Sequence, residues 1–417
     1  MTETRSAARL LLALPDFRHY ILVRFIASLG YLMVTVAVGW HIYDLTRRPL
    51  DLGYAGLVQF LPAVVLTLYA GQVADRMSRR AILVICLVAQ TLAILVLLYL
   101  LVSGATAVWP IYVVLVVLGS ARVFAAPAFS AMLPKLVPEE RFGPAVALSS
   151  TAWQTATIAG PALGGVLFAF GGAVVYGICA GLFALSGLVL MAIRTSTAPT
   201  GVSDRHGLSE LLAGVSFVRA QPMILGALSL DLFAVFLGGA TALLPIFARD
   251  ILEVGPTGLG ILRSAPAVGA ALIGLWLARF PLERHAGLKM YGGVAVFGVA
   301  TIVFGLSTNF LLSVVALAVL GGADMVSVVV RQTLVQLLTP DSMRGRVSAV
   351  NFLFIGGSNE LGEFESGVTA AWFGTVPAAV LGGVGSILVV LFFGWKFPGL
   401  RRVDRLSDLR PVSHPQP

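Results

Sequence analysis

The chain is dominated by twelve apolar runs that carry few charged residues and are separated by short polar segments. Each run has about the 20 residues that an α-helix needs to cross the ~30 Å hydrocarbon core of a bilayer. Only 12% of the residues are charged, against about 25% in an average soluble domain. The sequence therefore predicts an all-α polytopic membrane protein with twelve transmembrane helices, at about 18–43, 52–73, 81–103, 108–131, 143–169, 173–193, 222–247, 256–278, 288–306, 310–334, 346–371 and 375–395.

The distribution of lysine and arginine predicts how these helices are oriented. With the N-terminus in the cytoplasm, 21 of the 28 Lys and Arg residues fall in cytoplasmic segments and three in outer segments. Positive residues are concentrated on the cytoplasmic side of membrane proteins. We therefore expect both termini to be cytoplasmic. The net charge of +8 then serves orientation and contact with anionic lipids, and not nucleic-acid binding.

The longest predicted cytoplasmic segment divides the chain into two halves. It begins with a stretch rich in Ser, Thr, Pro and Gly and continues with an amphipathic stretch, Leu208 to Val218. We expect an N-terminal six-helix bundle at 1–193 with a short, uncleaved cytoplasmic leader, a cytoplasmic linker at 194–221, a C-terminal six-helix bundle at 222–397 and a cytoplasmic tail at 398–417.

The two halves also resemble each other weakly. Gly119 and the 28 residues after it align with the segment that begins at Gly321, at a constant offset of 202. Pro62 likewise resembles Pro266. A parallel repeat of six helices is typical of transporters whose substrate site lies between two bundles.

Charged residues inside the runs are the candidate functional residues, because a charge at membrane depth is costly and usually faces a cavity or a partner. They fall mainly in the first, fourth, seventh, tenth and eleventh runs, and none lies deep in the third, sixth, ninth or twelfth. We predict that the first, fourth, seventh and tenth helices line a wet central cavity. The expected proton-coupling and cavity residues are Arg24, Arg122, Asp231, Asp324, Glu360 and Glu363.

Spacing refines this prediction. Glu360 and Glu363 are three residues apart and share a helix face. Crowded carboxylates at low dielectric take up a proton more readily near neutral pH, which suits a proton carrier. Asp324 and Arg331 share a face but lie two turns apart, and we assign Arg331 and Arg263 a structural or gating role. The alternative for all of these charges is a set of ion pairs that lock helices together.

Residues 71–83, GQVADRMSRRAIL, resemble the loop between the second and third helices of the major facilitator superfamily, G-x-L-A-D-R-x-G-R-K/R-x-x-L. The segment lies on the predicted cytoplasmic side, where that superfamily carries it. Gly71 would let helices pack closely, and the arginines would bind helix ends and lipid phosphates. Ser78 replaces the usual glycine, so we expect a different turn there. The resemblance implies a conformational gate formed by Gly71, Asp75, Arg76, Arg79 and Arg80.

Residues 156–165, ATIAGPALGG, resemble the antiporter motif G-x-x-x-G-P-x-x-G-G of the same superfamily, with Ala156 in place of the first glycine. The resemblance implies exchange of substrate for protons through Gly160, Pro161, Gly164 and Gly165. The alternative is close packing of small residues with a kink at the proline. Arg122 resembles the arginine that these exporters carry in their fourth helix.

Residues 359–367, NELGEFESG, and 15–20, PDFRHY, resemble the enterobactin (siderophore) exporter branch, which lies close to macrolide efflux proteins. The resemblance to the superfamily covers about 15–397. It implies the major facilitator fold, with two six-helix bundles, in a bacterial inner membrane.

The same resemblance implies a secondary transporter, not an enzyme. We expect it to export an amphipathic organic compound, siderophore or drug-like, by proton antiport through alternating access. The expected partners are a small-molecule substrate and membrane lipids, and we expect a monomer with no cofactor, metal or catalytic residues. No G-x-x-x-x-G-K-[ST] occurs, which argues against ATP-driven transport. A lysolipid or lipid flippase on the same fold, and import in place of export, remain as alternatives.

Overall fold

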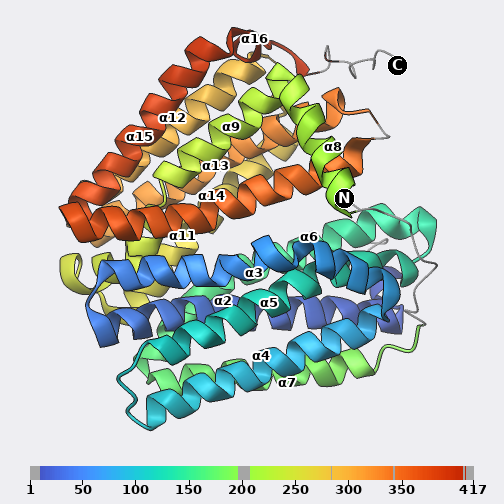
Figure 1. Ribbon diagram of the computed structural model, residues 1–417, viewed down its shortest axis with the longest axis vertical. Helices are drawn as coiled ribbons and strands as arrows, with labels where there is room; N and C mark the ends of the chain where they lie inside the picture. Colours follow the sequence, from blue (N-terminus) through green and yellow to red (C-terminus); the bar gives the residue numbers. More distant parts are fainter. Residues whose placement is uncertain (1–9, 196–206, 283, 341–342, 407–408, 410–417) are drawn as a thin grey trace. The chain divides into compact units, whose positions relative to one another are not determined.

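The structure is a computed structural model that describes residues 10–195, 207–282, 284–340, 343–406 and 409, and this part of the chain is helical (Figure 1). Each predicted run is helical over most of its length, because an apolar run that lipid surrounds must satisfy its backbone hydrogen bonds within itself. The prediction of an all-α fold is confirmed. The runs correspond to α2 (Pro15–Thr46), α3 (Pro49–Arg76), α4 (Arg79–Val102), α5 (Trp109–Met132), α6 (Phe142–Ala169), α7 (Gly172–Met191), α9 (Pro222–Leu237), α11 (Gly255–Arg279), α12 (Ala286–Leu306), α13 (Phe310–Leu338), α14 (Arg344–Phe373) and α15 (Thr375–Lys396).

Among the described residues, ten helices are long and apolar enough to cross a membrane by length and composition. The two other helices at predicted positions, α6 and α14, have 28 and 30 residues and are more polar. α6 contains the sequence SSTAWQTAT at 149–157, and α14 contains three glutamates. Their polar faces therefore need protein or water beside them, and lipid alone does not suffice.

The seventh predicted run is not one regular helix. α9 ends at Leu237 with Gly238 as its C-cap, and the chain continues through a 3₁₀ turn, the short α10 (Leu244–Ile246) and a π-helical turn, Phe247–Ile251. Two consecutive glycines favour such an ending. A Cβ added at Gly239 would lie 2.6 Å from the carbonyl oxygen of Gly362. The glycines thus let the end of α9 approach the backbone of α14.

The chain forms two compact units. The first contains Met1–Arg47, Val58–Asp204 and Val254–Ser264, and the second contains Arg48–Leu57, Arg205–Glu253 and Ala265–Pro417. In the first unit α4 and α7 lie side by side, and in the second α12 packs between α13 and α15 (Figure 1). The beginning of α3 belongs to the second unit and the beginning of α11 to the first. The division into bundles at 1–193 and 222–397 stays a prediction.

The internal repeat is visible in helix packing. In the first unit, Gly119 of α5 lies directly against Gln59 and Pro62 of α3. In the second unit, Gly321 of α13 lies directly against Pro266 of α11. Gly119 and Gly321, which are paired in the alignment, therefore each allow backbone contact with the second helix of their own half, at Gln59 in α3 and at Pro266 in α11.

The amphipathic part of the linker forms α8 (Gly207–Ala220). Phe217 and Val218 are buried in the apolar core of the second unit. Gly214 packs closely against the backbone of Arg346 at the start of α14. The end of the linker therefore belongs to the second unit. Most of the predicted leader (1–9), the polar part of the linker (196–206) and the end of the tail (410–417) lie outside the described residues.

Candidate functional site

Arg24 of α2 is held by aromatic rings. Its guanidinium carbon lies 5.1 Å from the ring centre of Phe129 on α5 and 5.4 Å from that of Trp153 on α6. Tyr20, one turn earlier on α2, donates a hydrogen bond to the carbonyl oxygen of Phe129 at 3.2 Å. We call Tyr20, Phe129 and Trp153 the aromatic cluster. Three helices distant in sequence thus converge on one cation.

The partners of Arg24 are the rings of the aromatic cluster and not a carboxylate. Within the described residues, Arg24 makes no ion pair, and its buried Nε atom has no hydrogen-bond partner. Cation–π contacts of a partly desolvated guanidinium contribute roughly 0.5–2 kcal/mol each. They stabilise the cation but leave its positive charge uncompensated.

Arg122 of α5 makes a related contact in the same unit. It donates a hydrogen bond to the hydroxyl of Tyr31 at 3.2 Å, and its guanidinium carbon lies 5.4 Å from the Tyr31 ring centre. Gln59 of α3 also donates to this hydroxyl. Tyr31 follows Arg24 by seven residues, so both lie on one face of α2. Two predicted cavity arginines therefore border the same helix face.

In the second unit, Asp231 of α9 forms an ion pair with Arg331 of α13, and both side chains are buried. The structure thus joins a residue that we predicted to couple protons with one to which we assigned a structural or gating role. Taking two charges out of water is costly, and only close mutual contact offsets that cost. The pair locks α9 to α13.

Asp324 lies two turns before Arg331 on α13 and is half-buried. Arg331, on the same helix face, forms its ion pair with Asp231 of α9. Within the part of the chain that the structure describes, Asp324 makes no hydrogen bond or ion pair. Of the predicted coupling acids, it is the one whose charge has the least protein stabilisation.

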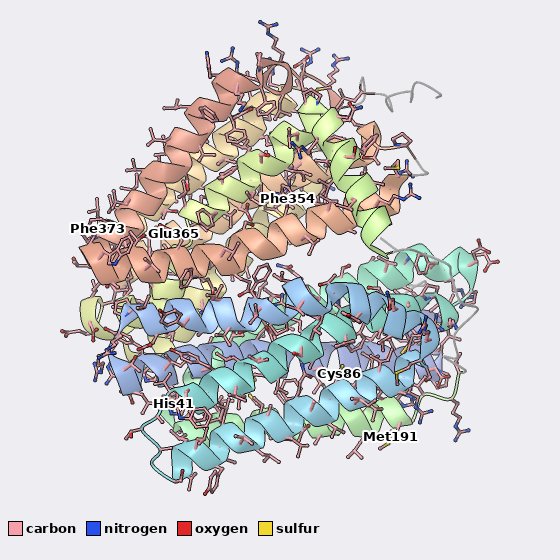
Figure 2. All side chains as sticks on the ribbon, viewed as in Figure 1. His41, Cys86, Met191, Phe354, Glu365 and Phe373 are labelled. Atoms are coloured by element: carbon pink, nitrogen blue, oxygen red, sulfur yellow. The ribbon has the colours of Figure 1, made fainter. Side chains whose placement is uncertain are left out.

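The glutamates of α14 are half-buried and have different surroundings. Glu365, marked in Figure 2, accepts a hydrogen bond from the Thr369 hydroxyl at 2.7 Å. Glu363 lies against Gly56 of α3, where an added Cβ would be 3.0 Å from its Oε2 atom. Glu360 and Glu363 share a helix face, as expected from their spacing. The Glu363 carboxylate therefore lies close to the backbone of a neighbouring helix.

The glycines of the antiporter motif bring α6 close to two helices. A Cβ added at Gly160 would lie 2.6 Å from the Leu32 side chain, and one at Gly164 would lie 2.9 Å from the Met33 carbonyl oxygen, both on α2. A Cβ at Gly165 would lie 2.7 Å from the Cα of Gly260 on α11. These contacts support the alternative interpretation of the motif, in which its small residues serve close helix packing. Proton exchange through this motif stays a prediction.

The predicted gating motif begins differently from expectation. The close helix packing expected at Gly71 is wrong, since no described atom lies within 4 Å of a Cβ added there. The Asp75 side chain lies outside the described residues. The different turn expected at Ser78 is a helix N-cap, in which its hydroxyl accepts a 3.3 Å hydrogen bond from the Ala81 backbone N–H. This cap begins α4 where the superfamily pattern has glycine.

The arginines of the motif divide between surface and interior. Arg76 is exposed at the end of α3, and Arg79 is buried at the start of α4. Arg80 donates hydrogen bonds to the carbonyl oxygens of Ile193 at 2.8 Å and Met191 at 2.5 Å. As expected of this motif, an arginine binds the end of a helix, here α7.

Asp16 is a functional candidate that sequence reasoning missed. Its carboxylate accepts hydrogen bonds from the backbone N–H groups of Arg194 at 3.1 Å and Thr195 at 2.8 Å. It thereby ties the residues after α7 to the beginning of α2. Asp16 belongs to the segment PDFRHY, but nothing in the neighbouring sequence indicates a partner 178 residues away.

The structure therefore brings the predicted residues together in two groups. Arg24 and Arg122 lie in the first unit among aromatic residues, and Asp231, Asp324, Arg331 and the α14 glutamates lie in the second. Arg263 is half-buried on α11. Sequence reasoning missed Tyr20, Tyr31, Gln59, Phe129 and Trp153. The available signal was the position of Tyr20 and Tyr31 at helical spacing from Arg24.

The chain is similar to known membrane transporters. The sequence profile of the transmembrane secretion effector family, part of the major facilitator superfamily, matches residues 11–416. The enterobactin exporter EntS of Citrobacter koseri is 27% identical over 410 residues, covering 97% of this chain and 94% of the relative. The uncharacterised MFS-type transporter YfiS of Bacillus subtilis is 27% identical over 403 residues, covering 90% and 92%.

Solved structures of transporters share the fold. A POT family transporter in complex with 5-aminolevulinic acid gives a TM-score of 0.73 at 12% identity, covering 92% of this chain and 96% of the other. A bacterial homologue of the human lysosomal transporter Spinster gives 0.72 at 13% identity, covering 95% and 98%. The predicted major facilitator fold is confirmed.

Proposed function

The chain belongs to the transmembrane secretion effector family of the major facilitator superfamily, and is therefore a multi-pass secondary transporter and not an enzyme. From this premise, we propose that it exports an amphipathic organic compound in exchange for protons. The proposed compound is siderophore-like or drug-like. The similarity to an enterobactin exporter over nearly the whole chain favours the siderophore class.

The observation that carries this proposal is the environment of Arg24. A cation that is held by rings and has no carboxylate partner within the described residues can bind an acidic group of a substrate. Phe129 and Trp153 offer flat apolar surfaces for the substrate's rings. Together they suit a molecule that carries both a negative charge and aromatic groups.

The acids of the second unit support proton coupling. Asp324 lacks a hydrogen-bond or ion-pair partner among the described residues, so little protein stabilisation is lost when it is protonated. Asp231 is held by Arg331 and would release it on protonation. We propose that protonation of one of the acids Asp324, Asp231, Glu360 or Glu363 shifts the equilibrium between two arrangements of the bundles. The proton then acts as a ligand that binds one conformation more tightly than the other.

The proposed setting is a bacterial inner membrane, with both termini in the cytoplasm and the transporter working as a monomer. The bacterial relatives and the distribution of positive residues support this setting. Gly71, Asp75, Arg76, Arg79 and Arg80 would then form the cytoplasmic gate. Gly160, Pro161, Gly164 and Gly165 would act in proton exchange.

Proton flux in inverted membrane vesicles tests the proposal. Vesicles are acidified, and a pH-sensitive dye reports proton release when enterobactin, a macrolide or a lipophilic cation is added. We expect enterobactin to release protons with the unmodified protein and the Asp324→Asn variant to lose most of this release. Asp404→Asn is the matched control, because Asp404 is exposed and lies beyond α15 in the same unit.

Two results would contradict the proposal. Release that Asp324→Asn leaves intact removes this residue from the coupling step. Transport of enterobactin that ignores the proton gradient removes antiport altogether. In the second case, labelled lysolipid in liposomes is the next substrate to measure.

A further inference from the structure

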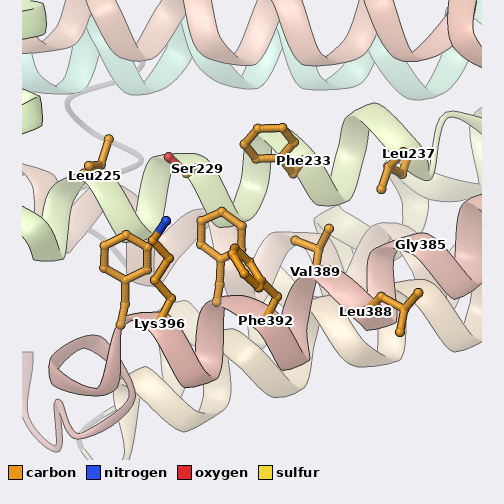
Figure 3. Close-up of a pocket in the computed structure, with 11 residues that line it drawn as sticks. Leu225, Ser229, Phe233, Leu237, Gly385, Leu388, Val389, Phe392 and Lys396 are labelled. Atoms are coloured by element: carbon orange, nitrogen blue, oxygen red, sulfur yellow. The ribbon is translucent and has the colours of Figure 1, made fainter.

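A groove of about 570 Å³ runs along the second unit between α9 and α15 (Figure 3). Its volume lies within the range of roughly 300–1,000 Å³ that is usual for sites that bind small molecules. Of the eleven described residues that line it, the polar ones are Ser229 and Lys396, and the others are apolar or glycine. The groove is therefore built for a hydrocarbon with one charged end.

Contacts between the two helices border the groove along its length. At one end, the Ser386 hydroxyl donates a hydrogen bond to the Ala234 carbonyl oxygen at 2.7 Å. At the other end, the Phe397 ring packs against Gly226, where an added Cβ would lie 2.9 Å away. Phe233 and Phe393, with ring centres 5.9 Å apart, lie between these contacts. The groove is thus a fixed feature of the packing.

The groove is open to the surroundings of the protein. Phe233 is 45% exposed, Leu388 58% and Phe392 49%. Both α9 and α15 belong to candidate membrane spans, and on the groove face, away from the buried Asp231, we expect lipid and not water to fill an open apolar groove. From Leu225 to Leu237 the groove follows α9 for about 18 Å, at 1.5 Å per residue. This length is close to one leaflet of a ~30 Å hydrocarbon core.

One end of the groove lies at headgroup level. Trp395 is 77% exposed and Lys396 is exposed at the end of α15, and such Trp and Lys residues mark the membrane interface. The Lys396 ammonium lies 5.4 Å from the Phe392 ring centre, beside the groove. Arg401 and Arg402 follow within the next turns and are exposed. Among the described lining residues, none is a carboxylate that would compete for this positive end.

We propose that the groove binds one acyl chain of an anionic phospholipid, whose phosphate is held by the Lys396 ammonium. The chain lies on Phe233, Leu388 and Val389, and the phosphate accepts hydrogen bonds from the lysine. The site is separate from the buried charges of the proposed transport pathway, and the proposal does not depend on which substrate the protein carries.

Native mass spectrometry of the full-length protein in detergent tests the proposal. The probes are phosphatidylglycerol and phosphatidylcholine with identical acyl chains, and deacylated glycerophosphoglycerol. We expect phosphatidylglycerol to bind most tightly, and Lys396→Gln to weaken its binding about fivefold, the factor that corresponds to ~1 kcal/mol per basic residue near an anionic headgroup. Lys289→Gln is the matched control, since Lys289 is an exposed lysine at the start of α12 in the same unit.

A second variant tests the acyl-chain part of the site. Ser229→Phe fills the middle of the groove, and we expect it to lower the occupancy of both phospholipids, while its unfolding temperature reports whether the variant is folded. Equal binding of phosphatidylglycerol to Lys396→Gln and to the unmodified protein would overturn the proposal. Competition by glycerophosphoglycerol would also overturn it, because a free phosphodiester would then suffice.

Discussion

At the residue scale, the protein accommodates the buried Arg331 and the half-buried Arg24 in two different ways. Arg331 has a carboxylate partner, Asp231, and the pair is neutral. Arg24 has rings, which stabilise the guanidinium without cancelling its charge. The charge of Arg331 is balanced by Asp231, whereas a ring-bound cation can still bind an anion. This difference separates a residue that holds helices together from one that is available to a substrate.

The ion pair makes a prediction about stability. Asp231→Asn leaves Arg331 buried without its counter-charge, so we expect a loss of about 3–5 kcal/mol in the free energy of unfolding. The double variant Asp231→Leu/Arg331→Met removes both charges and should recover most of this loss. Thermal unfolding in detergent measures both effects. An Asp231→Asn variant as stable as the unmodified protein would show that the pair does not lock α9 to α13.

The same variants separate stability from coupling. If the double variant is folded and still couples enterobactin to proton release, the role of Asp231 is structural. If it is folded but uncoupled, the coupling role predicted for Asp231 gains support.

Arg24 makes a prediction about binding. Arg24→Gln removes the cation, and we expect the dissociation constant of an acidic aromatic substrate to rise roughly ten- to hundredfold, as for the loss of a charge-assisted hydrogen bond. Arg24→Lys keeps the charge but loses the flat overlap with Phe129 and Trp153, so its effect should be smaller. Titration that follows tryptophan fluorescence measures both. Equal binding by Arg24→Gln and an Arg402→Gln control would exclude Arg24 from the site.

At the element scale, packing depends on which glycines face a neighbour. Gly165 of α6 lies against α11, so a methyl group has no room there. Gly181 of α7 has nothing within 4 Å of an added Cβ among the described residues. The same residue type is thus essential for close approach in one helix and replaceable in the next.

Alanine substitutions test this contrast. We expect Gly165→Ala to lower stability by about 1–3 kcal/mol, the usual range for overpacking. Gly181→Ala should be neutral or raise stability by up to ~1 kcal/mol, because alanine favours helix. The unfolding temperatures of both variants measure the difference. If the two variants behave alike, α6 and α11 are not held in the contact that the structure describes.

The helices themselves could be predicted from the sequence because a long apolar run is a local property. The sixth run, predicted at 173–193, forms α7 over Gly172–Met191. The irregular end of α9 could not be predicted from Gly238 and Gly239, because glycines are also common inside transmembrane helices.

The candidate site could be predicted in part. The positions of the charges follow from sequence, because each interrupts an apolar run. The partners of these charges do not follow from the sequence. Asp231 and Arg331 are 100 residues apart and meet only through helix packing. Phe129 and Trp153 are ordinary apolar residues in the sequence, and only the structure shows that they contact Arg24.

At the scale of the whole molecule, the distribution of lysine and arginine predicts which side of the membrane each helix end occupies. The C-terminal end of α3 carries Arg76 and that of α15 carries Lys396, so both ends should face the cytoplasm. Function depends on this orientation, because export and import by the same site differ only in the side from which substrate enters.

Reporter fusions after the C-terminus test the orientation. We expect green fluorescent protein at this position to fluoresce and alkaline phosphatase to be inactive, since each works on one side of the bacterial inner membrane. A fusion after Gly104, between α4 and α5, should behave in the opposite way. Active phosphatase at the C-terminus would reverse the predicted topology and, with it, the assignment of the gate to the cytoplasm.

The ring-bound Arg24 has an electrical consequence. A positive charge at membrane depth feels the transmembrane voltage, at ~2.3 kcal/mol per elementary charge for each 100 mV crossed. Any step that changes the depth of Arg24 in the field is biased by that voltage while the site is empty. A bound anion moves with the arginine and cancels the bias. Arg24 would therefore make the proton-loaded return step sensitive to voltage, and it would add no such sensitivity to the step that carries the anion.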